Sequence, residues 1–385
     1  MSSPPFRDVR IVDLTQILSG PFATQILADL GAEVIKVEAP EGDKARGNGP
    51  FVEGRSTYFA SLNRGKKSVC LDLKTDAGRD LFLSLVETSD AVVENFRPGV
   101  MARLGLGFER LKAMNPRLIY AACSGFGQEG PRAAQPALDA VIQAMAGTMA
   151  LTGDEEPARV GFSAGDIGAG LYLAFAIAAS LFRRERTGEG GFLDISMLET
   201  QVALLENAFA RHFATGEEPR RMGTRHPVMA PFQAFHTADR PIVVAVSSQA
   251  HWRGFCSALG HSEWLQDSRF ADGNARRLHL EALEAAIAPV LRQATADVWL
   301  ARLSEAQVPS GPLRTVGEVA SDPDLNDRGM FCEVDFDGVP VRVVGSPLRI
   351  DGLRRTARRV PALDADGEEV RAGCAASGER GGEVR

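Results

Sequence analysis

VRIVDLTQILSGPFATQILADLGAEVIKVE (residues 9–38) is the stretch that decides the fold class. Its first six residues, VRIVDL, predict a short buried strand, and Ser19-Gly20-Pro21 supplies a helix cap followed by a proline suited to a first turn. Gly31 ends this helix, and EVIKVE (33–38) alternates as a second strand. A strand–helix–strand unit implies two parallel strands joined by a right-handed crossover.

The same alternation continues along the first half of the chain. We predict further strands at 68–73, 90–94 and 118–122, with a helix over 76–88, so the class is α/β. After Thr187 the pattern changes, and a polar segment broken by Gly and Pro suggests a linker over 213–230. A strand at 241–247 and helical patterns over 250–260 and 280–305 then predict a smaller second domain, and the Gly- and charge-rich end predicts a flexible tail.

Composition narrows the class of protein. A chain of 385 residues suggests about two domains, and 44% hydrophobic with 24% charged residues fits a globular protein. The formal charge of −7 argues against a general nucleic-acid partner. Five scattered cysteines favour reduced thiols and a cytoplasmic location, and the start of the chain has no apolar segment typical of a secretory signal. The most apolar stretch, 171–182, is too short to span a bilayer, so we expect no membrane partner.

Three common kinds of site fit the sequence poorly. A dinucleotide site needs GxGxxG between strand and helix, but the first turn holds one glycine. The six histidines show no ligand spacing, so we predict no metal. GFSAG (161–165) matches the GxSxG elbow of serine hydrolases, yet 159–160 is too short for the strand that must precede the elbow, and we expect 166–170 to delay the helix. A glycine-rich turn that contains a serine is therefore the favoured interpretation of this motif, and a serine hydrolase is the alternative.

Other residues could hold an anion or act as a nucleophile. Arg64, Lys66, Lys67 and Lys74 surround one predicted strand, while Asn95, Phe96, Arg97 and Arg103 follow another, where either a phosphate-bearing ligand or solvent would suit them. Asp166 lies in GDIGAG (165–170) before an apolar helix that we expect from Leu171. The carboxylate is either a simple helix cap or an accessible nucleophile for activated acyl groups.

Eight segments, in order, make the chain resemble the class III CoA-transferase family, which also includes formyl-CoA and carnitine-CoA transferases. They are DLTQILSGPFATQILADLGAEVIKVEAP (13–40), NRGKKSVCLDLKT (63–75), DAVVENFRPGVMARLGL (90–106), GFGQEGP (125–131), GDIGAG (165–170), RERTGEGGFLDISMLE (184–199), VPSGPLRTVGEVASDP (308–323) and Arg328-Gly329-Met330. The resemblance implies a Rossmann-like large domain over 1–205 plus 316–360, a small α/β domain over 225–315, and an interlocked homodimer. The composition of residues 361–385 predicts a flexible tail.

The resemblance also implies roles for single residues. Asp166 corresponds to the catalytic aspartate, and Ser163 then forms part of the approach to it. Gly168 is a candidate backbone donor to an oxyanion. The residues that match CoA-contacting positions are Lys74, Asn95, Phe96 and Arg103, together with Leu71 and Arg97.

The implied reaction moves CoA from a short acyl-CoA, such as succinyl-CoA, to a carboxylic acid, with CoA as part of the substrate and no permanently bound cofactor. Racemases of the same superfamily carry His-Asp where this chain has Leu138-Asp139, and leucine cannot move a proton. Asp139 has either a hydrogen-bonding role at the site or a structural one. Leu18 and Ala39 replace the glutamine and arginine of formyl-CoA transferases, which argues against formate or oxalate. A racemase and a non-catalytic acyl-CoA-binding protein remain the alternatives.

Overall fold

The computed structural model describes residues 3–351, 353–354, 356 and 359–381. The chain divides into two compact units, of which the first contains Met1–Met149, Arg159–Glu217 and Pro323–Arg385. The second contains Ala150–Ala158 and Glu218–Asp322. It is therefore longer at both ends than the expected small domain (225–315), and it includes a short piece that comes before Asp166 in the chain.

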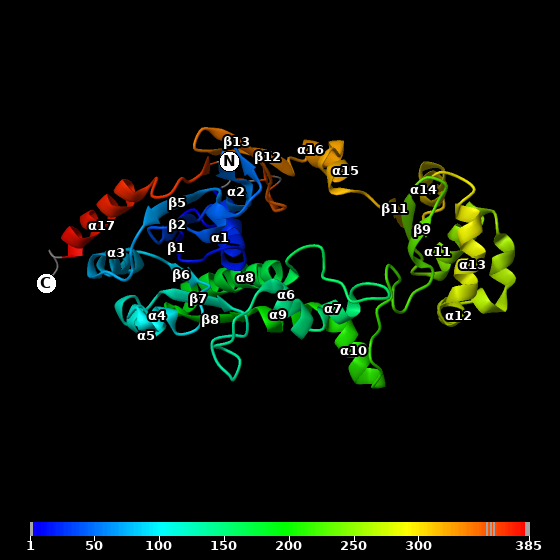
Figure 1. The fold of residues 1–385 in the computed structure, drawn as a ribbon, viewed down its shortest axis with the longest axis horizontal. Coiled ribbons are helices and arrows are strands. Elements are labelled where there is room, and N and C mark those ends of the chain that lie inside the picture. The colour runs from blue at the N-terminus through cyan, green and yellow to red at the C-terminus, as the bar shows by residue number, and fades with distance from the viewer. Residues whose placement is uncertain (1–2, 352, 355, 357–358, 382–385) are drawn as a thin grey trace. The chain divides into compact units, whose positions relative to one another are not determined.

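A six-stranded parallel sheet forms the centre of the first unit (Figure 1). The strands lie in the order β5-β2-β1-β6-β7-β8 across the sheet. When these six strands are numbered by their position along the chain, the order is 3-2-1-4-5-6, as in dinucleotide-binding folds. This confirms the predicted parallel α/β sheet. The strands are β1 (Arg10–Asp13), β2 (Glu33–Glu38), β5 (Lys66–Cys70), β6 (Ala91–Glu94), β7 (Ile119–Ser124) and β8 (Gly191–Ser196).

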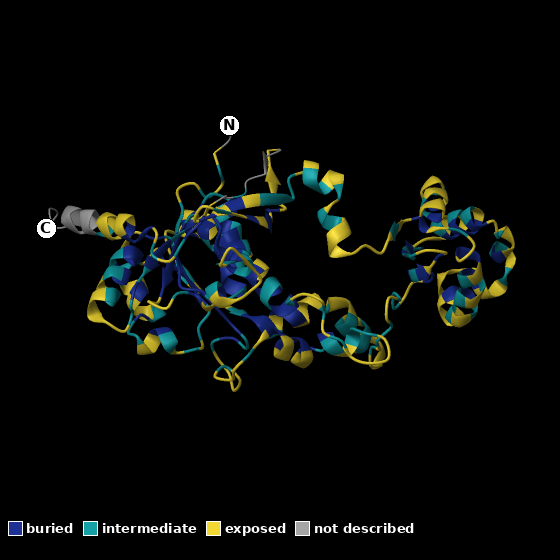
Figure 2. Ribbon diagram, turned by 45° about the horizontal axis from the view of Figure 1, so that its top comes forward, coloured by how far each residue is buried: buried dark blue, intermediate teal, exposed yellow. Residues whose placement is uncertain are grey.

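Both faces of this sheet are covered by helices, which explains why its central strands are apolar throughout. Ile11 and Val12, adjacent in β1, enter two different core clusters, one on each face. One cluster includes α1 (Ser19–Asp29), α6 (Asp139–Met145) and α8 (Ala164–Thr187), and the other includes α3 (Asp76–Glu87) and α5 (Phe108–Met114). Figure 2 shows the buried residues gathered along the sheet and against these helices.

The remaining elements of the first unit are shorter. Its other helices are α2 (Thr57–Asn63), α4 (Val100–Arg103), α9 (Met197–Leu204), α10 (Glu206–Thr215), α16 (Pro323–Asp327) and α17 (Gly367–Gly381), with the turn of 3₁₀ helix η1 (Lys44–Gly47); α7 (Thr148–Leu151) leads into the second unit. Its small strands are β3 (Phe51–Val52), β4 (Arg55–Ser56), β12 (Phe331–Phe336), β13 (Val339–Val344), β14 (Arg349–Ile350), β15 (Leu353–Arg354) and β16 (Arg359–Val360).

A buried charge network lies where β1 ends. Asp13 Oδ2 lies 2.9 Å from Lys66 Nζ, and both side chains are fully buried. Burial by itself would raise the pKa of Asp13, but the charges of Lys66 and Lys36 outweigh it and hold that pKa well below its usual range. Thr24 of α1 also donates to Asp13, at 2.7 Å. The network therefore ties β1, β5 and α1 together beneath the loop that follows β1.

Helix α8 begins seven residues earlier than the sequence predicts, at Ala164 and not at Leu171. The helix continues through its glycines, which let α1 pack closely against it. A Cβ on Gly170 would lie 2.7 Å from the Ser19 carbonyl oxygen of α1. Among the described residues, α8 is long and apolar enough to cross a membrane by length and composition, a test that the core helix of a soluble protein also passes. Its buried residues Ala169, Leu173 and Ile177 belong to the core cluster shared with α1.

Part of the predicted tail (361–385) contacts the central sheet in the described residues. Asp364 Oδ1 accepts a 2.7 Å hydrogen bond from the Cys70 backbone N–H, and Asp366 Oδ2 accepts one of 2.9 Å from that of Ser68. Val370 of α17 is buried in the core cluster. These carboxylates pair with the backbone of β5, the edge strand, whose N–H groups would otherwise lack partners.

The second unit is built around an antiparallel sheet of order β11-β10-β9. Trp252, Phe255 and Trp299 are prominent members of its own core cluster. Its elements are β9 (Phe232–His236), β10 (Pro241–Ala245), β11 (Ser310–Pro312), α11 (Gln249–Leu259), η2 (Ser262–Gln266), η3 (Ser268–Phe270), α12 (Gly273–Leu278), α13 (Leu280–Leu291), α14 (Ala296–Glu305) and α15 (Val316–Ala320). The helical pattern predicted over 280–305 is thus two helices.

Candidate active site

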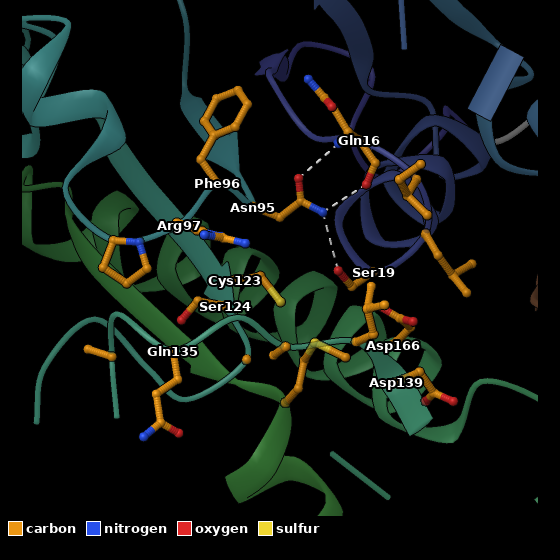
Figure 3. Close-up of a pocket in the computed structure, with 18 of the residues that line it drawn as sticks. Gln16, Ser19, Asn95, Phe96, Arg97, Cys123, Ser124, Gln135, Asp139 and Asp166 are labelled. Carbon is orange, nitrogen blue, oxygen red and sulfur yellow. Dashed lines mark hydrogen bonds between the residues drawn. The ribbon is translucent and has the colours of Figure 1, made fainter. Parts of the chain in front are cut away.

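A cavity of about 250 Å³ opens at the carboxyl ends of β1, β6 and β7. The strand order reverses between β1 and β6, and ligands of open α/β sheets bind at such a switch point. Figure 3 shows Asp166 and Asp139 on one side of the cavity and Phe96 and Arg97 on another. The full lining is Gln16, Ile17, Leu18, Ser19, Lys44, Asn95, Phe96, Arg97, Pro98, Cys123, Ser124, Gly125, Ala133, Gln135, Ala137, Leu138, Asp139, Asp166 and Met197.

The loop after β1 is held in a strained conformation. Ile17 has a φ of 68°, in the left-handed region that β-branched residues rarely adopt. The Asn95 amide accepts a hydrogen bond from Gln16 N and donates one to Gln16 O, both at 2.8 Å (Figure 3). Ile17 N also donates to Asp43 Oδ1, at 3.2 Å. These bonds hold the strained turn in place, and they set Ser19 at the start of α1 beside Asp166.

Asp166 lies in the first turn of α8, so it is not the helix cap that one interpretation expects. The N-cap residue is Ser163, which makes no side-chain capping bond. Burial, followed by the negative charge of Asp139, raises the pKa of Asp166 to about 6, against the lowering effects of a hydrogen bond from Ser19 and of the Arg159 charge. The position near a helix N-terminus also favours a carboxylate. Asp166 is therefore largely ionised above pH 7 and is only partly buried.

Asp139 begins α6 and holds the start of α8. Its Oδ1 accepts a 2.8 Å hydrogen bond from the Gly165 backbone N–H. Its Oδ2 accepts hydrogen bonds from Gln143 Nε2 at 2.7 Å and from Arg159 Nη2 at 3.2 Å. The fully buried Gln143 also accepts from Val160 N at 3.0 Å. Asp139 thus both lines the cavity and anchors the segment that leads to Asp166.

Gly168 has a clear packing role within α8. A Cβ at this position would lie 3.0 Å from side-chain atoms of both Thr200 and Leu204 in α9. As the fifth residue of the helix, Gly168 is positioned to donate its N–H to the Ala164 carbonyl, four residues earlier. The absence of a side chain therefore lets α9 approach the helix that carries Asp166.

The residues expected to contact CoA fall into two groups. Asn95, Phe96 and Arg97 line the cavity, although the Asn95 amide is already engaged with Gln16. Lys74 and Arg103 are exposed and lie outside the cavity lining, and Leu71 is buried in the core.

Several site residues were not identified from the sequence. Ser19 and Arg159 act on Asp166, and Cys123 lines the same cavity, yet each is distant from Asp166 in sequence or belongs to no motif. Ser19 could have been found, because it begins the helix after the loop that follows the first strand of a parallel sheet, where ligand sites form. Arg159 carries no comparable signal, since only the packing of α6 brings it to its partner Asp139.

The serine-elbow interpretation finds little support. The helix does begin directly after Ser163, so the expectation that 166–170 would postpone it is wrong. However, residues 158–162 form no strand, and Ser163 Oγ accepts a 3.1 Å hydrogen bond from Arg159. No histidine is among the described residues that line the cavity, so this serine has no general base there. Across the described chain, no group of three or more His, Cys, Asp or Glu could hold a metal ion.

Comparison with known proteins identifies the family. The family model of CoA-transferase family III matches residues 6–367. The chain belongs to this family. It is 42% identical over 373 residues to an acetyl-CoA:oxalate CoA-transferase of Acetobacter aceti, an alignment that covers 95% of each chain. It is 38% identical over 377 residues to a succinyl-CoA:mesaconate CoA-transferase of Haloarcula hispanica, covering 94% of each.

A solved structure gives the same result for the fold. The crystal structure of a CAIB/BAIF family protein from Brucella suis superposes with a TM-score of 0.85 at 38% sequence identity, covering 97% of this chain and 100% of that one. The resemblance drawn from the eight sequence segments is thus confirmed. As a family III CoA-transferase, the protein acts on an acyl-CoA thioester and a carboxylate acceptor.

Proposed function

We propose that this CoA-transferase moves CoA from a short acyl-CoA to a short dicarboxylic acid through covalent intermediates on Asp166. The observation that carries the proposal is the position of Asp166, a partly accessible carboxylate with a pKa of about 6 that lines the cavity at the switch point. An ionised carboxylate can attack an activated acyl group without a metal or a separate base.

The reaction requires four displacements. Asp166 Oδ attacks the thioester carbonyl carbon, the C–S bond breaks, and CoA leaves as the thiolate. The thiolate then attacks the Asp166 carbonyl carbon of the mixed anhydride, which releases the donor acid and leaves an aspartyl-CoA thioester. The acceptor carboxylate attacks this thioester and releases the thiolate again. The thiolate finally attacks the acceptor acyl carbon, and the electron pair of the broken C–O bond returns to Asp166. Each step exchanges one activated acyl group for another.

Phe96 and Arg97 are proposed to bind CoA at the β6 side of the cavity. An aromatic face suits the adenine and a guanidinium suits a phosphate. Lys74 and Arg103, both exposed, would contact phosphates farther from Asp166. Asn95 would act mainly by holding the Gln16 backbone, and Leu71 by supporting the strand end next to the bound ligand.

The substrate class is proposed from the relatives. Both named relatives act on dicarboxylic acids, oxalate in one case and mesaconate in the other. A dicarboxylate acceptor is therefore the proposal, with succinyl-CoA as the donor. The relative named for oxalate keeps oxalate among the acceptors to be tested, although Leu18 and Ala39 argue against it. Leu138 lines the cavity where the superfamily's racemases carry histidine, which favours transfer over racemisation.

We further propose that the protein is a cytoplasmic, interlocked homodimer. Five free cysteines support a reducing compartment. Helix α8 exposes the apolar side chains of Leu171, Tyr172, Phe175 and Phe182, a surface suited to a second copy of the chain. Light scattering should give twice the chain mass, and Phe175→Glu should shift the protein toward monomers. A wild-type monomer at micromolar concentration would contradict the dimer.

The central test is covalent trapping. With an acyl-CoA donor, hydroxylamine or borohydride should modify the wild-type enzyme on the peptide that contains Asp166, as read by mass spectrometry. Asp166→Ala should lose both the modification and CoA transfer, while Ser163→Ala should still transfer CoA. An active Asp166→Ala variant would overturn the proposal.

A further inference from the structure

The proposed reaction poses an electrostatic problem at Asp166. The acid substrate must bring a carboxylate to this side chain, yet Asp139 is close enough for its charge to raise the pKa of Asp166. A second anion in a cavity of about 250 Å³ is repelled unless a cation compensates its charge. The acid substrate therefore needs a basic partner near Asp166.

Arg159 is the basic residue placed to meet this need. Its guanidinium is within hydrogen-bond distance of Asp139 and of Ser163, the residue that precedes α8, and its charge lowers the pKa of Asp166. Lys44 and Arg97 belong to the cavity lining, whereas Arg159 lies next to it, 3.2 Å from the lining residue Asp139. Arg97 follows Phe96 on the β6 side proposed for CoA.

The Arg159 guanidinium uses only one of its three nitrogen atoms in hydrogen bonds within the described part of the chain. Its Nη2 donates to Asp139 Oδ2 at 3.2 Å and to Ser163 Oγ at 3.1 Å. In the described part of the chain its Nε and Nη1 have no hydrogen-bond partner, and the side chain is 43% exposed. A guanidinium in this state can bind a carboxylate through its remaining N–H groups.

The backbone that carries Arg159 is anchored at the next residue. Val160 N donates to Gln143 Oε1 at 3.0 Å, and Gln143 Nε2 donates to Asp139 Oδ2 at 2.7 Å. One buried glutamine therefore sets both the arginine loop and the carboxylate that the arginine contacts. This arrangement places a partly free guanidinium beside the start of α8 without requiring a loop to close.

We propose that Arg159 binds the reacting carboxylate of the acid substrate and orients it toward Asp166. The inference rests on the proposed function and adds the residue that recognises the acid. The acceptor carboxylate oxygen attacks the aspartyl-CoA carbonyl carbon, and the C–S bond breaks with release of the thiolate. Because the two halves of the exchange mirror each other, the donor acid leaves from the same position. Arg159 thus serves the incoming acid and the outgoing one alike.

Steady-state kinetics of Arg159→Met and Arg159→Lys provide the test, with succinyl-CoA as donor and mesaconate, glutarate and oxalate as acceptor probes. In Arg159→Met, the KM for an acceptor used by the wild type should rise at least tenfold, as should the inhibition constant of succinate as product. The KM for succinyl-CoA should change less than twofold. Arg159→Lys keeps the positive charge but lacks the planar guanidinium that binds a carboxylate through two N–H groups, so its acceptor KM should lie between those of the wild type and Arg159→Met.

The control is Arg10→Met, since Arg10 is comparably exposed and pairs with Glu33 at the opposite, amino-terminal end of β1. It should leave both KM values unchanged. An unchanged acceptor KM in Arg159→Met would overturn the inference, as would an equal rise in both KM values, which a purely structural role through Asp139 predicts. Either result leaves the proposed function standing, which fails only if Asp166→Ala remains active.

Discussion

The backbone N–H of Gly165 donates a 2.8 Å hydrogen bond to Asp139 Oδ1, so one carboxylate caps the helix turn that carries the other, Asp166. The bond fixes the start of α8, and it also brings a negative charge close to the proposed nucleophile. Asp139 therefore has two opposing effects: it positions Asp166, and it raises the pKa of that group.

Asp139→Asn should move the acid limb of the kcat/KM profile to lower pH. The Asp166 pKa of about 6 is raised first by burial and then by the Asp139 charge, so removing that charge lowers it. A shift of about one pH unit is the expected order for loss of a nearby like charge. Rates measured between pH 4.5 and 8 test this, and a limb displaced toward higher pH would contradict the assignment. Asn can still accept the bond from Gly165, so kcat at pH 8 should fall less than in Asp139→Ala.

Asp166→Asn should stabilise the protein while abolishing transfer. The pKa of Asp166 is about 6 in the folded chain, compared with an ordinary value of 3.8. Ionisation of Asp166 therefore destabilises the folded state, and this cost grows from about pH 4 to about pH 6 and is complete above pH 6. The variant should therefore gain about 1–2 kcal/mol at pH 8, allowing for screening at a partly exposed group. Urea unfolding at pH 8 and pH 4 tests this, since the gain should disappear at pH 4. A loss of stability at pH 8 would refute the predicted cost.

Gly170→Ala should destabilise the first unit and impair the site. A Cβ there would lie 2.7 Å from the Ser19 carbonyl oxygen and 3.0 Å from Phe22 Cδ1, so α1 must move away from α8. Overpacking of this kind costs about 1–3 kcal/mol. Gly161→Ala is the matched control, because a Cβ there meets nothing within 4 Å, and its effect should stay within about 0.5 kcal/mol. Thermal unfolding of the two variants measures the difference. Equal stability of the two variants would show that the close approach of α1 to α8 at Gly170 is unimportant.

Asp13→Ala should destabilise the fold by about 3–5 kcal/mol, because it removes the carboxylate that compensates the charge of the fully buried Lys66. The pKa of Asp13 is lowered in the folded chain, so this contribution is present above the ordinary pKa of 3.8 and is lost as the pH falls. Urea unfolding at pH 7 measures the cost. The double variant Asp13→Leu with Lys66→Met should lose less than Asp13→Ala alone, and a larger loss would argue against an uncompensated charge as the cause.

The class of fold, the family and the candidate nucleophile could all be predicted from the amino-acid sequence. Strands such as EVIKVE (33–38) and the Gly31 break express local preferences that act within a few residues, so they can be recognised without the structure. Ordered motifs around Asp166 and Asn95 then identified the family, because each motif is a continuous segment. Local rules failed at α8, where Gly168 and Gly170 suggested a turn.

Only the tertiary structure decided how these residues are connected. The backbone of Ser19, which is 151 positions earlier, packs against Gly170, so a glycine is favoured at that place in the helix. Arg159 donates a hydrogen bond to Asp139, which is 20 positions earlier and begins α6. The pKa of Asp166 likewise depends on burial and on charges from separate elements. Such effects arise from distances in space between segments remote in sequence, and no periodicity or motif within one segment encodes them.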